Sequence, residues 1–223
     1  MNQGKLDEKV YKKHFRVAIF GSARIKKDDP AYQEIYKLAQ LIAAENIDIV
    51  TGGGPGIMQA ASKGHRDGRK TNTIQSIGLN ITIPQEQKPN RHLDIKKEFD
   101  RFSERLDTFM VLSDAVVVAP GGVGTLLEFA YTWQLVQVKH ICNIPIILLG
   151  DMWADFLKWI AMYPLNQGFL ANKDIDRLFL AKNSLEAFRI IKKFHDGYKR
   201  GEDICLNFKK YKIAVQKGKY MNK

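Results

Sequence analysis

The sequence predicts an α/β fold in which a mostly parallel β-sheet is flanked by helices on both faces. Short apolar runs without a strict alternation of polar and apolar residues are typical of parallel strands that are covered on both sides. These runs alternate with helical patterns through short connections, which is the order found in doubly wound sheets. No internal repeat or linker interrupts the alternation, so we expect a single domain with a Rossmann-like, doubly wound architecture.

Each expected element has its own pattern. The expected strands are FRVAIFG (15–21), IDIVTGG (47–53), TIQSIGLNITI (73–83), AVVVA (115–119) and IPIILLG (144–150). Helical patterns occupy residues 30–42, 56–65, 99–112 and 125–138, a further one begins near Trp153, and SLEAFRIIKKF (184–194) follows with Ser184 as its expected N-cap. A polar loop, residues 84–94, separates the third strand from the helix that follows it.

The chain of 223 residues carries a formal net charge of +11, and much of the excess lies near its two ends. We divide it into a basic N-terminal extension (1–14), an α/β domain (15–200) and a basic C-terminal tail (201–223). The charge could serve a nucleic-acid surface, attract anionic metabolites or belong to a solvated tail. Lysines and aromatics interleave at 208–211 without a recognisable nucleic-acid-binding motif, so we expect a solvated tail and no nucleic-acid partner.

Targeting signals and metal-ligand patterns are not evident in the sequence. The stretch MNQGKLDEKVYKKHF lacks the apolar core of a secretory signal, and no apolar run approaches the roughly 20 residues needed to cross a bilayer. We therefore expect a cytoplasmic protein without membrane contact. Cys142 and Cys205 have no Cys or His neighbours at metal-ligand spacing, so neither a disulfide scaffold nor a metal site is expected. Cys142 is expected to be a small core residue.

Three glycine- or serine-rich loops fall at the carboxyl ends of expected strands, where parallel sheets bind their ligands. None has the spacing of a P-loop or of the G-x-G-x-x-G fingerprint, so ATP hydrolysis and conventional NAD binding are not expected. What remains is anion binding at a helix N-terminus, because glycines let backbone N–H groups approach a phosphate closely. The candidate binding residues are Gly21, Ser22 and Arg24 in the first loop, Gly52, Gly53, Gly54 and Gly56 in the second, and Gly121, Gly122 and Gly124 in the third, followed by the hydroxyl of Thr125.

Glu128 lies four residues after Gly124 in an expected helix. Helical side chains tilt toward the N-terminus, so its carboxylate can reach back beside the anion site. A carboxylate in the first turn of a helix also compensates the helix dipole. The residues alone leave catalysis and dipole compensation equally open.

Two motifs decide between these alternatives. TGGGPGIMQAA (51–61) contains the pattern GGGxxGxM, and PGGVGTLLE (120–128) matches PGGxGTxxE at every fixed position. Together they resemble the signatures of the LOG family. Members of this family are phosphoribohydrolases of nucleoside 5′-monophosphates, and many of them were once labelled lysine decarboxylases. The resemblance extends through FGSARI (20–25), SIGLNI (76–81) and PIILLG (145–150), and it covers roughly residues 15–165.

The resemblance implies an enzyme that hydrolyses the N-glycosidic bond of AMP or an N6-modified AMP to free base and ribose 5-phosphate, without a cofactor. By position, Glu128 matches the family's catalytic glutamate and Arg105 its catalytic arginine. Family members are usually homodimers with substrate pockets near the subunit interface, so a homodimer is expected. The phosphate loop is matched by Gly121, Gly122, Gly124 and Thr125, and the facing wall by Gly53, Gly54 and Met58.

Two positions depart from the family pattern. Leu106 stands where the family usually has lysine, and Leu127 stands where an acidic residue is frequent. These losses of charge leave open a second interpretation, a non-catalytic carrier of a nucleotide or of the molybdenum cofactor, because such carriers are similar to this family. A nucleic-acid-associated protein, suggested by charge alone, is the third. Nothing in the sequence resembles a pyridoxal-phosphate site, so lysine decarboxylation is set aside.

Overall fold

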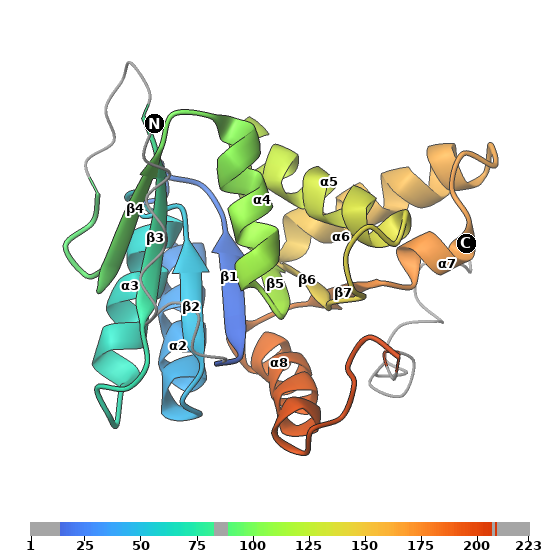
Figure 1. Cartoon of the computed structure of the whole chain (residues 1–223). Helices are drawn as coiled ribbons and strands as arrows, with labels where there is room; N and C mark the ends of the chain where they lie inside the picture. Colours follow the sequence, from blue (N-terminus) through green and yellow to red (C-terminus); the bar gives the residue numbers. More distant parts are fainter. Residues whose placement is uncertain (1–13, 83–88, 207, 209–223) are drawn as a thin grey trace.

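The computed structural model describes residues 14–82, 89–206 and 208. Within them, seven parallel strands form one sheet in the order β4-β3-β2-β1-β5-β6-β7 (Figure 1). The strands are β1 (Arg16–Phe20), β2 (Asp48–Thr51), β3 (Ser76–Ile81), β4 (Ile95–Phe99), β5 (Ala115–Val118), β6 (Ile146–Leu149) and β7 (Leu178–Ala181). The helices are α2 (Pro30–Ala44), α3 (Ile57–Gly68), α4 (Phe102–Leu112), α5 (Val123–Gln137), α6 (Asp151–Ile160), the π-helical turn η1 (Ala161–Leu165), α7 (Asn172–Ile175) and α8 (Ser184–Lys199). None of these described helices has the length and apolar character to cross a bilayer. Most of the predicted extension (1–14) and tail (201–223) lies outside the described residues.

The predicted α/β, Rossmann-like fold is confirmed, but the sequence pattern missed two strands. β4 reads IKKEF and lies at one edge of the sheet, where charged side chains remain in water and hide the apolar signal of a strand. β7 lies at the other edge and reads LFLA, which has no β-branched residue, and a short apolar run of this kind cannot be told from a piece of a buried helix. The helix expected over 99–112 consequently begins later, at Phe102.

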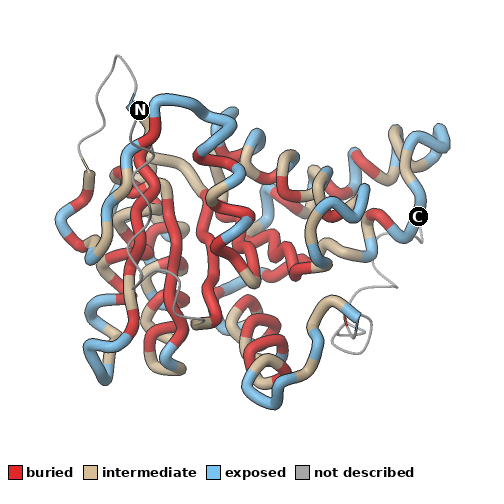
Figure 2. Tube along the Cα trace, viewed as in Figure 1, coloured by how far each residue is buried: buried red, intermediate tan, exposed pale blue. Residues whose placement is uncertain are grey.

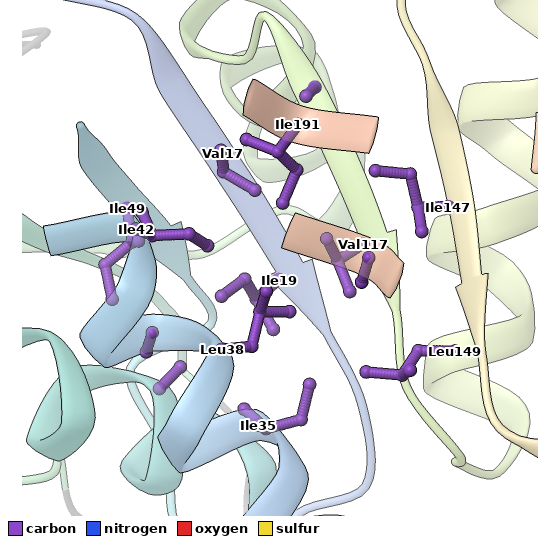
Figure 3. Packing of buried hydrophobic residues seen from close by; sticks show 14 of the residues in the cluster. Val17, Ile19, Ile35, Leu38, Ile42, Ile49, Val117, Ile147, Leu149 and Ile191 are labelled. Atoms are coloured by element: carbon purple, nitrogen blue, oxygen red, sulfur yellow. The ribbon is translucent and has the colours of Figure 1, made fainter. Parts of the chain in front are cut away.

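Hydrophobic layers cover both faces of the sheet, and β1 contributes to each. Val17 and Ile19 pack with residues of α2, α3 and α8 (Figure 3). Ala18 and Phe20 pack with residues of α4, α5 and α6 on the opposite face. All of β1 is therefore buried, as are the other central strands in Figure 2, which explains why their sequences do not alternate.

The strand order identifies where a ligand is expected. After β1 the chain adds β2, β3 and β4 on one side, and then crosses to add β5, β6 and β7 on the other. The order thus reverses between β1 and β5, which pair directly with each other. Doubly wound sheets bind ligands at such a reversal, outside the carboxyl ends of the strands. The loops after β1 and β5 lie at this position.

Two local predictions were wrong. The N-cap of α8 is Asn183 rather than Ser184, because the Asn183 side chain accepts a hydrogen bond from the backbone N–H of Glu186. Cys142 is exposed, because it lies in the connection between α5 and β6, before the chain enters the sheet. Both cysteines are free, and the sulfur of Cys205 accepts a hydrogen bond from the backbone of the residue after Cys142.

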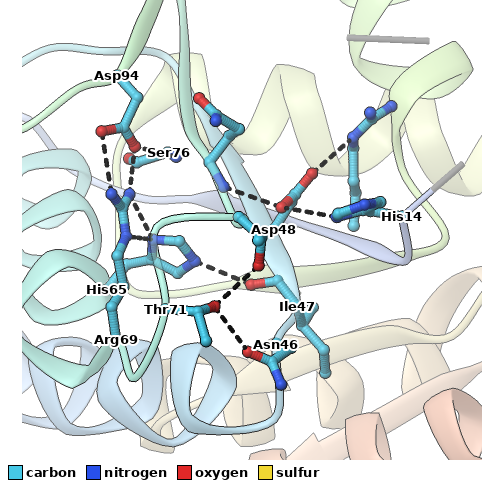
Figure 4. Close-up of polar contacts among 12 residues, drawn as sticks. His14, Asn46, Ile47, Asp48, His65, Arg69, Thr71, Ser76 and Asp94 are labelled. Atoms are coloured by element: carbon cyan, nitrogen blue, oxygen red, sulfur yellow. Dashed lines mark hydrogen bonds and ion pairs between the residues drawn. The ribbon is translucent and has the colours of Figure 1, made fainter. Parts of the chain in front are cut away.

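A polar network lies at the amino ends of β2 and β3, opposite the glycine loops (Figure 4). The fully buried His65 donates through Nε2 to the carbonyl of Ile47 at 2.8 Å, and its Nδ1 accepts from Arg69 at 3.1 Å. Arg69 also pairs with Asp94, whose carboxylate accepts the backbone N–H of Ser76. Burial, with a smaller contribution from the charge of Arg69, lowers the pKa of His65 to about 4, so the ring is neutral at pH 7.

Candidate functional site

The three predicted glycine-rich loops meet at the carboxyl ends of β1, β2 and β5. The backbone N–H of Ser22 donates to the carbonyl of Pro120 at 3.1 Å, and the Ser22 carbonyl accepts the N–H of Ile57 at 3.0 Å. Gly21 packs directly against the Ile57 side chain. Gly56 has a φ of +65°, and a Cβ there would overlap the Ser22 carbonyl, so this junction requires glycine. Ser22 therefore joins the first loop to both of the others.

The N-terminus of α5 is uncapped. Its N-cap residue is Gly122, which has no side chain to accept hydrogen bonds from the free N–H groups of the first turn. A Cβ on Gly122 or Gly124 would meet no described atom within 4 Å, so space is open beside these groups. Thr125 packs against Gly121 and supplies a hydroxyl in the same turn. The free N–H groups and the positive end of the helix dipole suit this end of α5 to an anion.

Glu128 and Arg105 form a salt bridge next to this helix end. Arg105 Nη2 donates to Glu128 Oε1 at 3.0 Å, and the side chains of Glu128 and Arg105 are only 12% and 9% exposed, respectively. Arg105, on α4, also donates through Nε to the carbonyl of Leu79 in β3 at 2.8 Å. Its guanidinium group lies over the ring of Phe109. These contacts fix Arg105, and the second turn of α5 presents Glu128 to it.

Burial changes the ionisation of Glu128. Removal from water penalises the carboxylate and raises its pKa to about 7, although the charge and the hydrogen bond of Arg105 act in the opposite direction. Desolvation therefore outweighs the attraction to Arg105. A carboxyl group that titrates near neutral pH can accept or release a proton under working conditions, as general acid–base catalysis requires.

Residues 52–54, which we call the glycine wall, face this pair. A Cβ on Gly52 would lie 2.6 Å from Arg105 Nη2 and 2.7 Å from the sulfur of Met58, so the Gly52 backbone is in close contact with both. The N–H of Gly54 donates to the same sulfur at 3.4 Å. Gly53 has a φ of +75°, a conformation that favours glycine. The predicted second loop and Met58 thus lie against the Glu128–Arg105 pair.

Two asparagines behind the glycine wall were missed by sequence reasoning. The amide of Asn80, in β3, lies where a Cβ of Gly53 would be, and no described donor reaches its Oδ1. Asn90 donates through Nδ2 to the carbonyls of Gly53 and Gly54, at 3.1 Å each. An asparagine in a polar loop is usually a turn residue, so nothing in the sequence marked Asn90 as a partner of the distant glycines.

Arg24 is a predicted site residue whose side chain the structure does not bring to the pair. Its side chain is exposed and makes no contact with Glu128 or Arg105 in the described part of the chain. It borders a shallow pocket of about 400 Å³ together with Ser22 and Asp29. Its backbone N–H donates to the Ser22 hydroxyl at 3.1 Å, so it helps to shape the first loop.

One group within the described ranges has the spacing of metal ligands. It consists of Glu45, His195 and Asp196, whose donor atoms lie within 4.8 Å of one another. Both carboxylates already pair with the ammonium groups of Lys192 and Lys199. The group lies where α2 ends and β2 begins, near the amino ends of the strands, whereas the glycine wall follows the carboxyl end of β2. We therefore assign no metal to the candidate site.

Comparisons with known proteins identify the fold and the family. An uncharacterized protein of Archaeoglobus fulgidus is 26% identical over 142 residues, which is 62% of this chain and 86% of that protein. The fold is shared with the molybdenum cofactor binding protein of Rippkaea orientalis, at 23% identity and a TM-score of 0.62, over 82% of this chain and 99% of that one. It is also shared with the molybdenum cofactor carrier protein of Chlamydomonas reinhardtii, at 19% identity and a TM-score of 0.59, over 81% and 98% of the two chains. Residues 58–191, more than half of the chain, match the family described as "Possible lysine decarboxylase". The chain belongs to this LOG-like, lysine decarboxylase-like family.

Proposed function

We propose that the protein hydrolyses the N-glycosidic bond of a nucleoside 5′-monophosphate, AMP or an N6-modified AMP, to free base and ribose 5-phosphate. The proposal rests on the buried Glu128–Arg105 pair beside the uncapped N-terminus of α5. The 5′-phosphate would bind the free N–H groups of the first turn of α5, and the glycine wall would face the ribose and the base. Glu128 would then lie beside the sugar, about one helical turn from the phosphate.

The chemistry of this bond suits a buried carboxylate. Loss of the base builds positive charge on the sugar ring, and ionised Glu128 would stabilise that charge. Unit charges ~4 Å apart attract by about 4 kcal/mol at an effective dielectric constant near 20. That energy is worth roughly three decades of rate if it acts only in the transition state. Glu128 could also bind ribose hydroxyls or orient the attacking water, while Arg105 opposes its protonation.

We also propose a homodimer with the active site near the subunit interface. Phe102, Val123, Leu126 and Leu127 are exposed on α4 and α5 beside the site. Exposed apolar side chains gathered beside a polar site are typical of a surface that an assembly covers. Light scattering should give twice the 25.5 kDa of one chain, and Leu127→Asp should give a monomer. A wild-type monomer at micromolar concentration would contradict the dimer.

A non-catalytic carrier of a nucleotide or of the molybdenum cofactor is the second candidate. It is favoured by Leu127, which leaves the position next to Glu128 uncharged, and by the carrier proteins that share the fold. In a carrier the same N–H groups would hold a phosphate, and Glu128 would be a residue of the binding wall. Lysine decarboxylation is not proposed, because none of the site residues described above is a lysine.

Release of base and ribose 5-phosphate from AMP, N6-modified AMP, GMP, CMP and IMP tests the two candidates. Glu128→Gln and Arg105→Ala are assayed beside the wild type, with nucleotide binding measured by calorimetry. Wild-type turnover that falls at least about a hundredfold in both folded variants supports the hydrolase. Binding without turnover of any nucleotide supports the carrier. Failure to bind any nucleotide or phosphorylated pterin would contradict both.

A further inference from the structure

Asn90 has only 5% of its surface exposed, and its polar atoms are directed at the glycine wall and its own loop. Its backbone N–H donates to the carbonyl of Gly53 at 2.8 Å. Its Nδ2 donates to the carbonyls of Gly53 and Gly54, with the hydroxyl of Ser62 at 3.5 Å. Its Oδ1 accepts the backbone N–H of His92 at 3.1 Å. Asn90 therefore links the segment that precedes β4 to the glycine wall.

The wall depends on these bonds. Gly53 and Gly54 are buried, so their carbonyls need hydrogen-bond donors from the protein. Among the described residues, Asn90 is the side chain that donates to both. Leu93, from the same segment as Asn90, packs against Gly53, and the amide of Asn80 supports Gly53 from β3. The wall is thus held between β3 and residues 90–93.

Movement of the wall would change the space between the wall and the ion pair. Gly52 directly precedes Gly53, and its backbone touches the guanidinium of Arg105 and the sulfur of Met58. Arg105 and Glu128 belong to α4 and α5, which do not depend on Asn90 for their position. Loss of the Asn90 donors would therefore displace one wall of the site while the other side keeps its geometry.

We propose that Asn90 is a positioning residue that sets the separation between the glycine wall and the N-terminus of α5. By setting this separation, Asn90 controls the affinity for a nucleoside monophosphate, whereas the rate of bond cleavage depends on Asn90 much less. This inference rests on the proposed function, in that the ligand is the same nucleotide.

Asn90→Asp is the informative variant, because it keeps the shape and the acceptor for His92 but loses both amide donors. We expect the Kd and the KM for AMP to rise by about tenfold or more, with kcat within about threefold of wild type and an unchanged pH profile. Asn90→Ala should behave similarly. Asn183→Ala, which removes the N-cap of α8, is the matched control: it lowers stability without changing the KM.

Amide hydrogen exchange gives a readout that does not need turnover. Faster exchange at residues 53–58 in Asn90→Asp, together with weaker AMP binding, supports the inference. Unchanged AMP affinity, or a KM that rises equally in Asn183→Ala, would overturn it. Wild-type protein that neither binds nor cleaves AMP would overturn the proposed function instead. In that case, unchanged amide exchange at residues 53–58 in Asn90→Asp would overturn the positioning role of Asn90. Faster exchange there would support a positioning role for Asn90 toward whatever ligand binds at the wall.

Discussion

Replacement of Glu128 by glutamine should remove the pH dependence of the free energy that is needed to bury the side chain at this position. The glutamine side chain would keep an oxygen that accepts from Arg105 Nη2, so the shape of the site and the hydrogen bond at 3.0 Å are retained. What disappears is the ionisable proton. The difference in unfolding free energy between Glu128→Gln and the wild type therefore isolates the titration of this single buried group.

The size and sign of the effect follow from the pKa. In the unfolded chain the group titrates near its ordinary value of 4.5, and in the folded protein near 7. Between these values the folded state retains a proton that the unfolded state has released, so the contribution of Glu128 to wild-type stability falls as the pH rises through this window. A difference of two to three pKa units corresponds to about 3 kcal/mol, at 1.36 kcal/mol per unit. Because the side chain is only 12% exposed, solvent screening reduces this value little.

Urea denaturation at intervals between pH 4 and pH 8 measures the effect. The free energy of Glu128→Gln relative to wild type should increase by about 3 kcal/mol over that range, mostly between pH 4.5 and 7. Glu104→Gln, which removes an exposed carboxylate from α4, is the matched control and should follow the wild type. Parallel curves for Glu128→Gln and wild type would refute the assignment of a desolvated carboxyl group at this position.

Three further changes test other parts of the structure. Arg105→Ala removes the cation that favours ionised Glu128, so the acid limb of the pH–rate profile should move to higher pH while turnover falls; an unmoved limb would contradict the coupling. Gly53→Ala should lose about 1–3 kcal/mol of stability, because the new Cβ would overlap the Asn80 amide at a φ of +75°. Gly124→Ala, whose Cβ would meet no described atom within 4 Å, is the control and should change stability by less than about 0.5 kcal/mol. Equal shifts in melting temperature for the two variants would contradict this. His65→Gln removes a group that the unfolded chain protonates before the folded chain does, so its free energy of unfolding relative to wild type should rise by about 3 kcal/mol as the pH falls from about 6.5 to 4; urea titrations at the two pH values check it.

The parts of the site that local sequence could predict are those carried by contiguous motifs. GGGPGIM and PGGVGTLLE each lie on one strand–loop–helix unit, so their glycines and Glu128 could be placed from spacing alone. The strands they follow are fully buried and apolar, which made the parallel sheet predictable. Arg105 required the family pattern, since nothing in RFSERLDTFM sets it apart from a surface arginine on a helix.

What the sequence did not predict depends on contacts between distant segments. Asn90 acts on glycines 36 and 37 residues earlier in the chain, and its loop had no signal beyond polarity. The pKa of Glu128 depends on burial that α4, α5 and the glycine wall create together. β4 was missed because an edge strand is free to carry charges. Cys142 was misplaced because its position just before an apolar strand was taken to indicate burial, whereas the connection before β6 leaves it exposed.

Glu128 lies near the carboxyl ends of the strands and His65 near their amino ends, and the two titrations change stability in opposite directions. The contribution of Glu128 to stability falls as the pH rises from 4.5 to 7, and the contribution of His65 grows as the pH rises from 4 to 6.5. Because both shifts are worth about 3 kcal/mol, their contributions nearly cancel in the wild type and reappear with opposite slopes in the two single variants. The double variant should again lack both slopes, since sites without shared partners act additively. Urea titrations of the four proteins test this. Replacing His65 in the Glu128→Gln background should change the pH dependence of stability by the same amount as replacing it in the wild type. A larger change would mean that the two groups are coupled through the sheet.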